Sequence, residues 1–349
     1  MRIIESLPEG DFSLSFEAHT LYFKQPSGTS RGVLTEKKLW LLTLKFASNE
    51  TKGIGECSVI PGLSPDFISV YEYEKKLTEV CQNPRCFLEN PSLLNDFPSV
   101  LFGLDSAYLD WKNGGKQTYF DTAFNTGKVK IPINGLIWMG DKSFMEKQIE
   151  EKLAQGFRCL KMKVGAIDFE SEVDLLKSIR NRFPSNELEL RVDANGAFSL
   201  DQAFNKLERL SQFEIHSIEQ PIKAGNWNEM AELCVKTPIP IALDEELIGV
   251  NSIENKILLL ETIKPQYIIL KPSLHGGFSG SKEWISLAEE KNIPWWMTSA
   301  LESNIGLTAI AQFASTFTND LPQGLGTGSL YTSNFESNLC VENGFIFVR

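Results

Sequence analysis

The chain has 349 residues, more than one compact hydrophobic core usually accommodates, so we expect one large domain and one smaller domain. With 42% hydrophobic and 23% charged residues, its composition is that of an ordinary globular protein. A net charge of −11 without blocks of Lys or Arg argues against a nucleic-acid partner, and no apolar run approaches the roughly 18 residues of a membrane span.

The N-terminus and the cysteines indicate a cytoplasmic protein. The opening sequence MRIIESLPEG lacks the long apolar segment of a signal peptide. Six cysteines are scattered without a C-x-x-C pair, which is typical of reduced thiols. We therefore expect a cytoplasmic location, whereas the oligomeric state is left open by these patterns.

Residues 1–128 are expected to form an α+β domain. Two strands with alternating apolar and polar residues flank a Gly/Ser-rich loop, and a Gly/Pro-punctuated segment precedes two helices. In chain order these are FSLSFEAHTLYF (12–23), QPSGTSRG (25–32), KKLWLLTLKF (37–46), the segment 53–66, and helices near 70–80 and 100–111.

From residue 129 to 328, short β-rich runs alternate regularly with amphipathic helices. This α/β alternation favours parallel β/α units that close into a TIM-like (β/α) barrel. Residues 329–349 are expected to form a C-terminal segment that returns to the first domain. The eight predicted strands lie within residues 132–138, 158–164, 188–194, 214–220, 239–245, 266–272, 293–299 and 323–328.

A polar residue ends each of seven successive strands, in phase with the β/α repeat. Because active sites of such barrels lie at the carboxyl ends of the strands, we expect these side chains to share one mouth. They follow one another at intervals of 25 to 30 residues: Lys163, Asp193, Glu219, Asp244, Lys271, Ser299 and Thr327.

Three of these residues, Asp193, Glu219 and Asp244, predict a metal site. Converging carboxylates repel one another, and hard oxygen ligands are best neutralised by Mg²⁺, with Mn²⁺ as a substitute. Zinc is disfavoured because the three histidines of the chain do not cluster by spacing. The alternative is that each carboxylate caps a helix or pairs with a nearby lysine.

Two lysines, Lys163 and Lys271, flank this predicted metal site and are candidate catalytic residues. Lys161 lies two residues before Lys163, so both point to the same face of the strand. An ammonium group near a cation loses its proton more readily, as a general base requires. The alternatives are surface lysines on an edge strand for the first pair, and a structural salt bridge for Lys271.

The motifs KMK (161–163), DAN (193–195), EQP (219–221), DE (244–245) and Lys271 resemble those of the enolase superfamily, muconate-lactonising subgroup. Members of this superfamily use a lysine or histidine base together with Mg²⁺. The resemblance implies a modified (β/α)7β barrel with an N-terminal α+β capping domain. It also implies a small-molecule carboxylate substrate, whose α-proton is removed.

Within the subgroup, SALESNIG (299–306) and GLGTGSLY (324–331) resemble the o-succinylbenzoate synthases of menaquinone biosynthesis. This implies an Mg²⁺-dependent syn-dehydration in which Lys163 removes and returns a proton while Lys271 stays protonated. Implied substrate-binding residues are Lys161, Asn195, Ser299, Gly326 and Thr327.

Two other functions stay open. Dipeptide epimerases of this subgroup usually carry Asp-x-Asp after the last strand, where residues 324–331 here hold no acid, but an N-succinylamino acid racemase would share the remaining residues. A barrel that has lost catalysis and serves in binding or assembly is the third possibility. The presence of every expected ligand and of both lysines argues against it.

Overall fold

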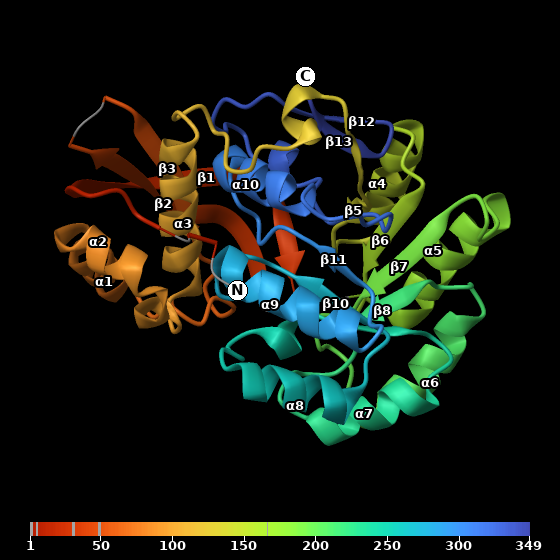
Figure 1. Cartoon of the computed structure of the whole chain (residues 1–349). Helices are drawn as coiled ribbons and strands as arrows, with labels where there is room; N and C mark the ends of the chain where they lie inside the picture. Colours follow the sequence, from red (N-terminus) through yellow and green to blue (C-terminus); the bar gives the residue numbers. More distant parts are fainter. Residues whose placement is uncertain (1–2, 5, 30–31, 48–49, 166) are drawn as a thin grey trace.

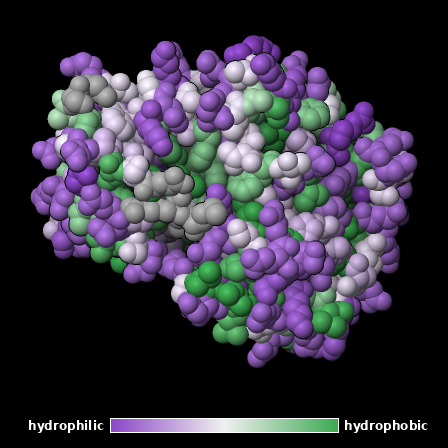
Figure 2. All heavy atoms as spheres, in the orientation of Figure 1, coloured by the Kyte–Doolittle hydropathy of each residue, from purple (hydrophilic) through white to green (hydrophobic). Residues whose placement is uncertain are grey.

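The computed structural model describes residues 3–4, 6–29, 32–47, 50–165 and 167–349. An N-terminal sheet with its helices lies beside a barrel whose helices form the outer layer (Figure 1). Figure 2 shows that hydrophilic side chains cover most of the face in view, with hydrophobic ones in small groups between them. Among the described residues, no helix is long and apolar enough to span a membrane.

The N-terminal part is an antiparallel sheet packed against helices. Strand β3 has the glycine-containing sequence KGIGECS, and α3 packs directly on it. A Cβ atom on Gly55 would lie 1.9 Å from the backbone oxygen of Gly103 in α3, so only glycine permits this approach. The elements are β1 Phe12–Thr29, β2 Gly32–Phe46, β3 Lys52–Ser58, α1 Val70–Gln82, α2 Pro84–Glu89 and α3 Pro98–Lys112.

The prediction of a loop at residues 25–32 was wrong in part. Strand β1 continues to Thr29 and β2 starts at Gly32, with Ser27 paired to Leu34 beyond a register shift. Backbone hydrogen bonds hold a hairpin together whatever the side chains are, so a Gly/Ser-rich composition does not end the strands. Residues 30–31 of the predicted loop lie outside the described residues.

The barrel sheet contains seven parallel strands in chain order, β5 to β11. Each predicted strand from 132–138 to 293–299 is confirmed, and seven of the connecting helices cover the outside (Figure 1). The strands are β5 Gly135–Ile137, β6 Cys159–Lys163, β7 Glu189–Asp193, β8 Ser217–Glu219, β9 Ile241–Leu243, β10 Tyr267–Leu270 and β11 Trp295–Met297. The helices are α4 Lys142–Ala154, α5 Phe169–Arg182, α6 Leu200–Ser211, α7 Trp227–Lys236, α8 Ile253–Ile263, α9 Gly277–Glu290 and α10 Asn304–Ala314.

The eighth run, predicted at residues 323–328, closes the barrel with single bridges in place of a strand. In the described chain, Gln323 bridges to Ile133 and Gly324 bridges to Thr298, both in parallel orientation. The Gln323 side chain adds two hydrogen bonds, since its Oε1 accepts from the Met297 amide at 2.7 Å and its Nε2 donates to the Leu321 carbonyl. The barrel is therefore of the (β/α)7β kind, with a minimal last strand.

The C-terminal residues contact both parts of the molecule. Strands β12 Leu339–Glu342 and β13 Phe345–Val348 form a small antiparallel sheet with β4 Ile131–Pro132, near the start of the barrel. Before them, Tyr331 bridges to Phe23 of β1. The domain boundaries at residues 128 and 328 remain predictions.

Replacing Gln323 by Leu should lower the free energy of unfolding by about 1–3 kcal/mol, because the buried Met297 amide loses its acceptor. Denaturant unfolding of the variant and of Gln202→Leu, a matched change at an exposed position of α6, measures the effect. Equal stability of the two variants would show that the Gln323 side chain does not secure the closure.

Candidate active site

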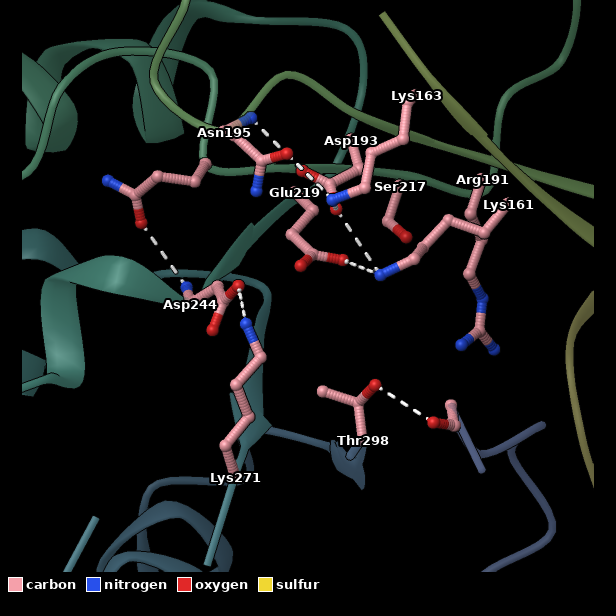
Figure 3. A network of polar contacts seen from close by, with 12 residues as sticks. Lys161, Lys163, Arg191, Asp193, Asn195, Ser217, Glu219, Asp244, Lys271 and Thr298 are labelled. Atoms are coloured by element: carbon pink, nitrogen blue, oxygen red, sulfur yellow. Dashed lines mark hydrogen bonds and ion pairs between the residues drawn. The ribbon is translucent and has the colours of Figure 1, made fainter. Parts of the chain in front are cut away.

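The strand register brings the predicted polar residues to one end of the barrel. Lys163 pairs with Asp193 between β6 and β7, and Asp193 pairs with Glu219 between β7 and β8. Asp244 and Lys271 directly follow β9 and β10. Figure 3 shows the five side chains converging on one small region at the carboxyl ends of the strands.

Buried ion pairs connect these lysines and carboxylates. The Lys161 Nζ lies 2.6 Å from Glu219 Oε2 and 3.3 Å from Asp193 Oδ2. The Lys163 Nζ lies 2.5 Å from Asp193 Oδ2 on the other side, and the Lys271 Nζ donates to Asp244 Oδ2. The three carboxylate side chains are at most 2% exposed, so each charge depends on its neighbours for neutralisation.

The pKa values follow from this burial and pairing. Burial acts to lower the pKa of Lys161, but the carboxylates of Glu219 and Asp193 outweigh it, so the pKa is raised and the ammonium group is retained. Lys271 behaves in the same way beside Asp244, and its pKa is also raised. Burial and the adjacent Asp193 carboxylate raise the pKa of Glu219, which makes it the least readily ionised of the three acids.

The donor set fits a hard divalent cation. The buried Oε1 of Glu219 and Oδ1 of Asp244 have no hydrogen-bond partner in the described chain. Buried carboxylate oxygens are costly without a partner, and oxygen ligands of this kind suit Mg²⁺. Lysine ammonium groups lie between the acids. Among the described residues, no three Asp, Glu, His or Cys side chains are placed closely enough to hold a metal ion without rearrangement.

A cavity of about 250 Å³ lies above the ion pairs, between the barrel mouth and the N-terminal sheet. Its floor carries Lys161, Lys163, Glu219 and Lys271. Glu219 is the one acid among the described residues that line the cavity. The rest of the wall is apolar or uncharged and consists of Gly32, Val33, Leu34, Ile60, Pro61, Leu63, Asn134, Leu136, Trp138, Asn195, Thr298, Ser299, Ala300, Leu301, Gly324, Gly326 and Thr327.

The four uncharged residues predicted to bind substrate all line this cavity. Asn195 Oδ1 accepts from the Lys163 Nζ at 2.6 Å, and its backbone has a positive φ of 45° that asparagine tolerates well. The hydroxyl groups of Ser299 and Thr327 hydrogen bond to each other at 2.5 Å across the barrel closure. Gly326 lies beside them in the wall.

The sequence did not predict two residues, Gln220 and Glu245, that hydrogen bond to the backbone or side chains of site residues. Gln220 Oε1 accepts from the backbone amides of Asp244 and Glu246, and its Nε2 donates to Glu246 Oε2 at 2.9 Å. Glu245 Oε1 accepts from Asn195 Nδ2 at 3.0 Å. Each missed residue directly follows a predicted one in the EQP or DE motif, which was the signal available for finding it.

His275, four residues after Lys271, does not line the cavity. It is 4% exposed, and its Nδ1 accepts from the Lys271 backbone amide at 3.0 Å. Burial lowers its pKa to about 3, so the ring is neutral and supports the turn that follows Lys271. Beneath the site, Trp296 packs inside the barrel with the Arg191 guanidinium 4.2 Å from its ring centre.

Comparison with known proteins identifies a family model that matches more than half of the chain and a relative that matches almost all of it. Residues 145–349 match the model of the family described as enolase C-terminal domain-like. A protein of Desulfotalea psychrophila named o-succinylbenzoate synthase is 47% identical, over 96% of this chain and 98% of its own length.

Solved structures agree with this match. The crystal structure of MenC from Desulfotalea psychrophila superposes with a TM-score of 0.86 at 44% identity, covering 97% of this chain and 99% of the other. A dipeptide epimerase from Cytophaga hutchinsonii, solved with Mg and the dipeptide D-Ala-L-Val, gives a TM-score of 0.81 at 20% identity and covers 97% and 93%. At that identity the second likeness shows the fold alone.

Replacing Lys161 by Met should destabilise the protein by about 3–5 kcal/mol in the presence of a chelator, because Glu219 and Asp193 lose a buried counter-charge. Denaturant unfolding measures the loss, and Lys177→Met on the exposed face of α5 is the matched control. A loss no larger than that of the control would mean that Lys161 does not neutralise the two acids.

Proposed function

The chain belongs to the family of enolase C-terminal domain-like proteins, and on that premise we propose that it acts as an o-succinylbenzoate synthase. The reaction removes water from 2-succinyl-6-hydroxy-2,4-cyclohexadiene-1-carboxylate and leaves aromatic 2-succinylbenzoate, a step of menaquinone biosynthesis. The observation that carries the proposal is a lysine on either side of three buried carboxylates, beneath a cavity whose lining among the described residues includes Glu219 as its one acid.

Lys163 is the proposed base. It takes the proton from the ring carbon that bears the carboxylate, and the electron pair of that C–H bond is delocalised onto the carboxylate as a dienolate. The pair then forms the new ring double bond as the C–O bond to the hydroxyl breaks. The same amine returns the proton to the departing hydroxyl, so hydrogen and oxygen leave together as water. Its contacts with Asp193 and Asn195 hold the nitrogen at the edge of the cavity.

Lys271 is the proposed electrostatic partner on the opposite side of the site. Its raised pKa keeps it positively charged beside Asp244. A fixed positive charge stabilises the dienolate that forms as the proton leaves, and it can interact favourably with the face of the product ring. Lys161 holds Glu219 and Asp193 in place and lies at the floor of the cavity.

Asp193, Glu219 and Asp244 are the proposed ligands of Mg²⁺, and the unpartnered carboxylate oxygens of Glu219 and Asp244 motivate the assignment. When bound, Mg²⁺ would supply positive charge for the oxygens of the substrate carboxylate as the enediolate develops. Mn²⁺ prefers the same ligands and is the alternative metal.

The wall of the cavity favours this substrate over a dipeptide. Apolar residues such as Ile60, Leu136 and Leu301 suit the ring and the succinyl chain. Residues 324–331 provide no acid for the ammonium group of a dipeptide. An N-succinylamino acid carries no such ammonium group, so its racemisation is the second candidate and is an outcome of the assay below.

Purified protein with Mg²⁺ should convert the hydroxycyclohexadiene carboxylate, seen as loss of the diene absorbance. Lys163→Ala and Lys271→Ala should each lower kcat by at least about 10²-fold, since each removes a group that acts on the reacting atoms. Lys177→Ala, an exposed position on α5, should retain full activity.

Two outcomes would contradict the proposal. Absence of turnover, together with deuterium exchange at the α-carbon of N-succinylamino acids in D₂O, would move the protein to the racemases. Full activity of Lys163→Ala would remove that lysine from the role of base.

Mg²⁺ should raise the thermal unfolding midpoint of the protein, because it binds the folded site and not the unfolded chain. Asp244→Asn should abolish most of that increase, whereas Asp174→Asn, an exposed acid on α5, should leave it unchanged. A titration with Mn²⁺ beside Mg²⁺ compares the two metals. An undiminished increase in Asp244→Asn would exclude Asp244 as a ligand.

A further inference from the structure

Three buried charges lie where the N-terminal sheet meets the segment after β11. Lys37 of β2 and Glu56 of β3 come from the sheet, and Glu302 comes from the barrel. They are 2%, 0% and 0% exposed, respectively. None of them lines the cavity, and none has a role in the proposed reaction. Buried charges destabilise a protein unless they are well paired, so the partners of these three side chains matter for stability.

Glu56 caps a helix that belongs to the other part of the molecule. Its Oε1 accepts from the Ser303 amide at 2.9 Å, and its Oε2 accepts from the Ser303 hydroxyl and from the Gly306 amide at 2.8 Å. These groups form the start of α10, where unpaired amides and the helix dipole favour an anion. A Cβ atom on Gly306 would lie 2.9 Å from Glu56 Oε2, so the glycine makes room for the carboxylate.

Lys37 contacts the same segment at Ala300, three residues before Ser303. Its Nζ donates to the Ala300 carbonyl at 2.9 Å across the boundary between the two parts. Burial lowers the pKa of Lys37 to about 8, while the nearby carboxylates of Glu302 and Glu56 act to keep it charged. Glu302 Oε1 in turn accepts from the Ser273 hydroxyl at 2.5 Å. The sheet and the barrel therefore share one buried polar cluster.

The backbone between these anchors is strained. Leu301 has a φ of +62°, a left-handed conformation that leucine rarely adopts and that costs about 1–3 kcal/mol. Its carbonyl accepts from the Tyr331 hydroxyl at 2.6 Å. Such a conformation persists only where its surroundings hold it, and here the contacts of Ala300, Leu301 and Ser303 do so.

This segment forms one wall of the cavity. Ser299, Ala300 and Leu301 all line it, and the Ser299 hydroxyl bonds to Thr327 on the neighbouring wall. A shift of the segment would move these side chains relative to the lysines on the floor. Misplacement of a substrate by about 1 Å can cost two orders of magnitude in rate.

We propose that Lys37 and Glu56 are positioning residues, which fix residues 299–303 in the one conformation that completes the substrate cavity. The N-terminal sheet thus contributes to substrate fit through the barrel backbone, in addition to the side chains that it places in the cavity. The kinetic part of the proposal rests on the proposed dehydration, whereas the structural part does not.

The first test is amide hydrogen exchange, which needs no substrate. Glu56→Gln and Lys37→Met should speed exchange of the amides in residues 299–306 at least about tenfold, while the strands β6 to β8 keep wild-type rates. Glu79→Gln and Lys45→Met, exposed changes in the same N-terminal part, serve as matched controls. Unchanged exchange in residues 299–306 would overturn the proposal.

The second test is kinetic. Both variants should raise KM for the hydroxycyclohexadiene carboxylate about tenfold, with a smaller fall in kcat, because the wall moves and the catalytic lysines do not. The pH profile of kcat should keep its wild-type shape. Folded variants with wild-type KM and kcat would reduce the two residues to a purely structural role and overturn the proposal.

A double variant separates stability from positioning. Lys37→Met alone removes a positive charge that favours the ionised form of the buried Glu302, whereas Lys37→Met with Glu302→Gln removes both charges. The double variant should regain most of the lost thermal stability yet keep the raised KM, because the Ala300 carbonyl still lacks its donor. Recovery of wild-type KM along with stability would contradict the proposal.

If wild-type protein itself fails to turn over the substrate, the proposed function fails, and hydrogen exchange still decides the structural part.

Discussion

Buried lysines and carboxylates at the mouth of the barrel must neutralise one another, and much of the structure serves that requirement. Lys161, Lys163 and Lys271 face Asp193, Glu219 and Asp244, so the formal charge of the ionised set is zero. The parallel register of β6, β7 and β8 provides the contact, since it aligns the ends of adjacent strands. The Gln220 side chain then bonds to the backbone amide of Asp244 after β9, and Glu245 bonds to the Asn195 side chain after β7.

The N-terminal sheet completes the site in two ways. Its apolar residues Leu21, Phe23 and Leu39 pack in one cluster with Trp138 and Leu301 of the barrel part, which holds the two parts together beside the cavity. Its charged residues reach further and bond to the backbone after β11. The apolar contacts bring the parts together without fixing direction, whereas the hydrogen bonds specify one geometry.

Agreement between sequence and structure was greatest where a periodic pattern had a single physical reading. The strands and helices from residue 132 to 316 were predicted closely, because buried parallel strands alternate with amphipathic helices. The agreement was poorest where backbone hydrogen bonds, and not side chains, define the structure. The paired residues 27–29 and 32–34 of the hairpin and the single bridges at Gln323 and Gly324 are two such places.

The sequence by itself determined which side chains meet at the barrel mouth, because residues one β/α unit apart must end neighbouring strands. It also determined their chemistry, three acids flanked by lysines. Only the tertiary structure decided how those charges pair, and that Gln220 and Glu245 bond to the Asp244 backbone and the Asn195 side chain. It also decided that Lys37 and Glu56 contact a cavity wall more than 240 residues away. Contacts of that separation depend on how the two parts pack, and packing leaves no periodic pattern in the chain.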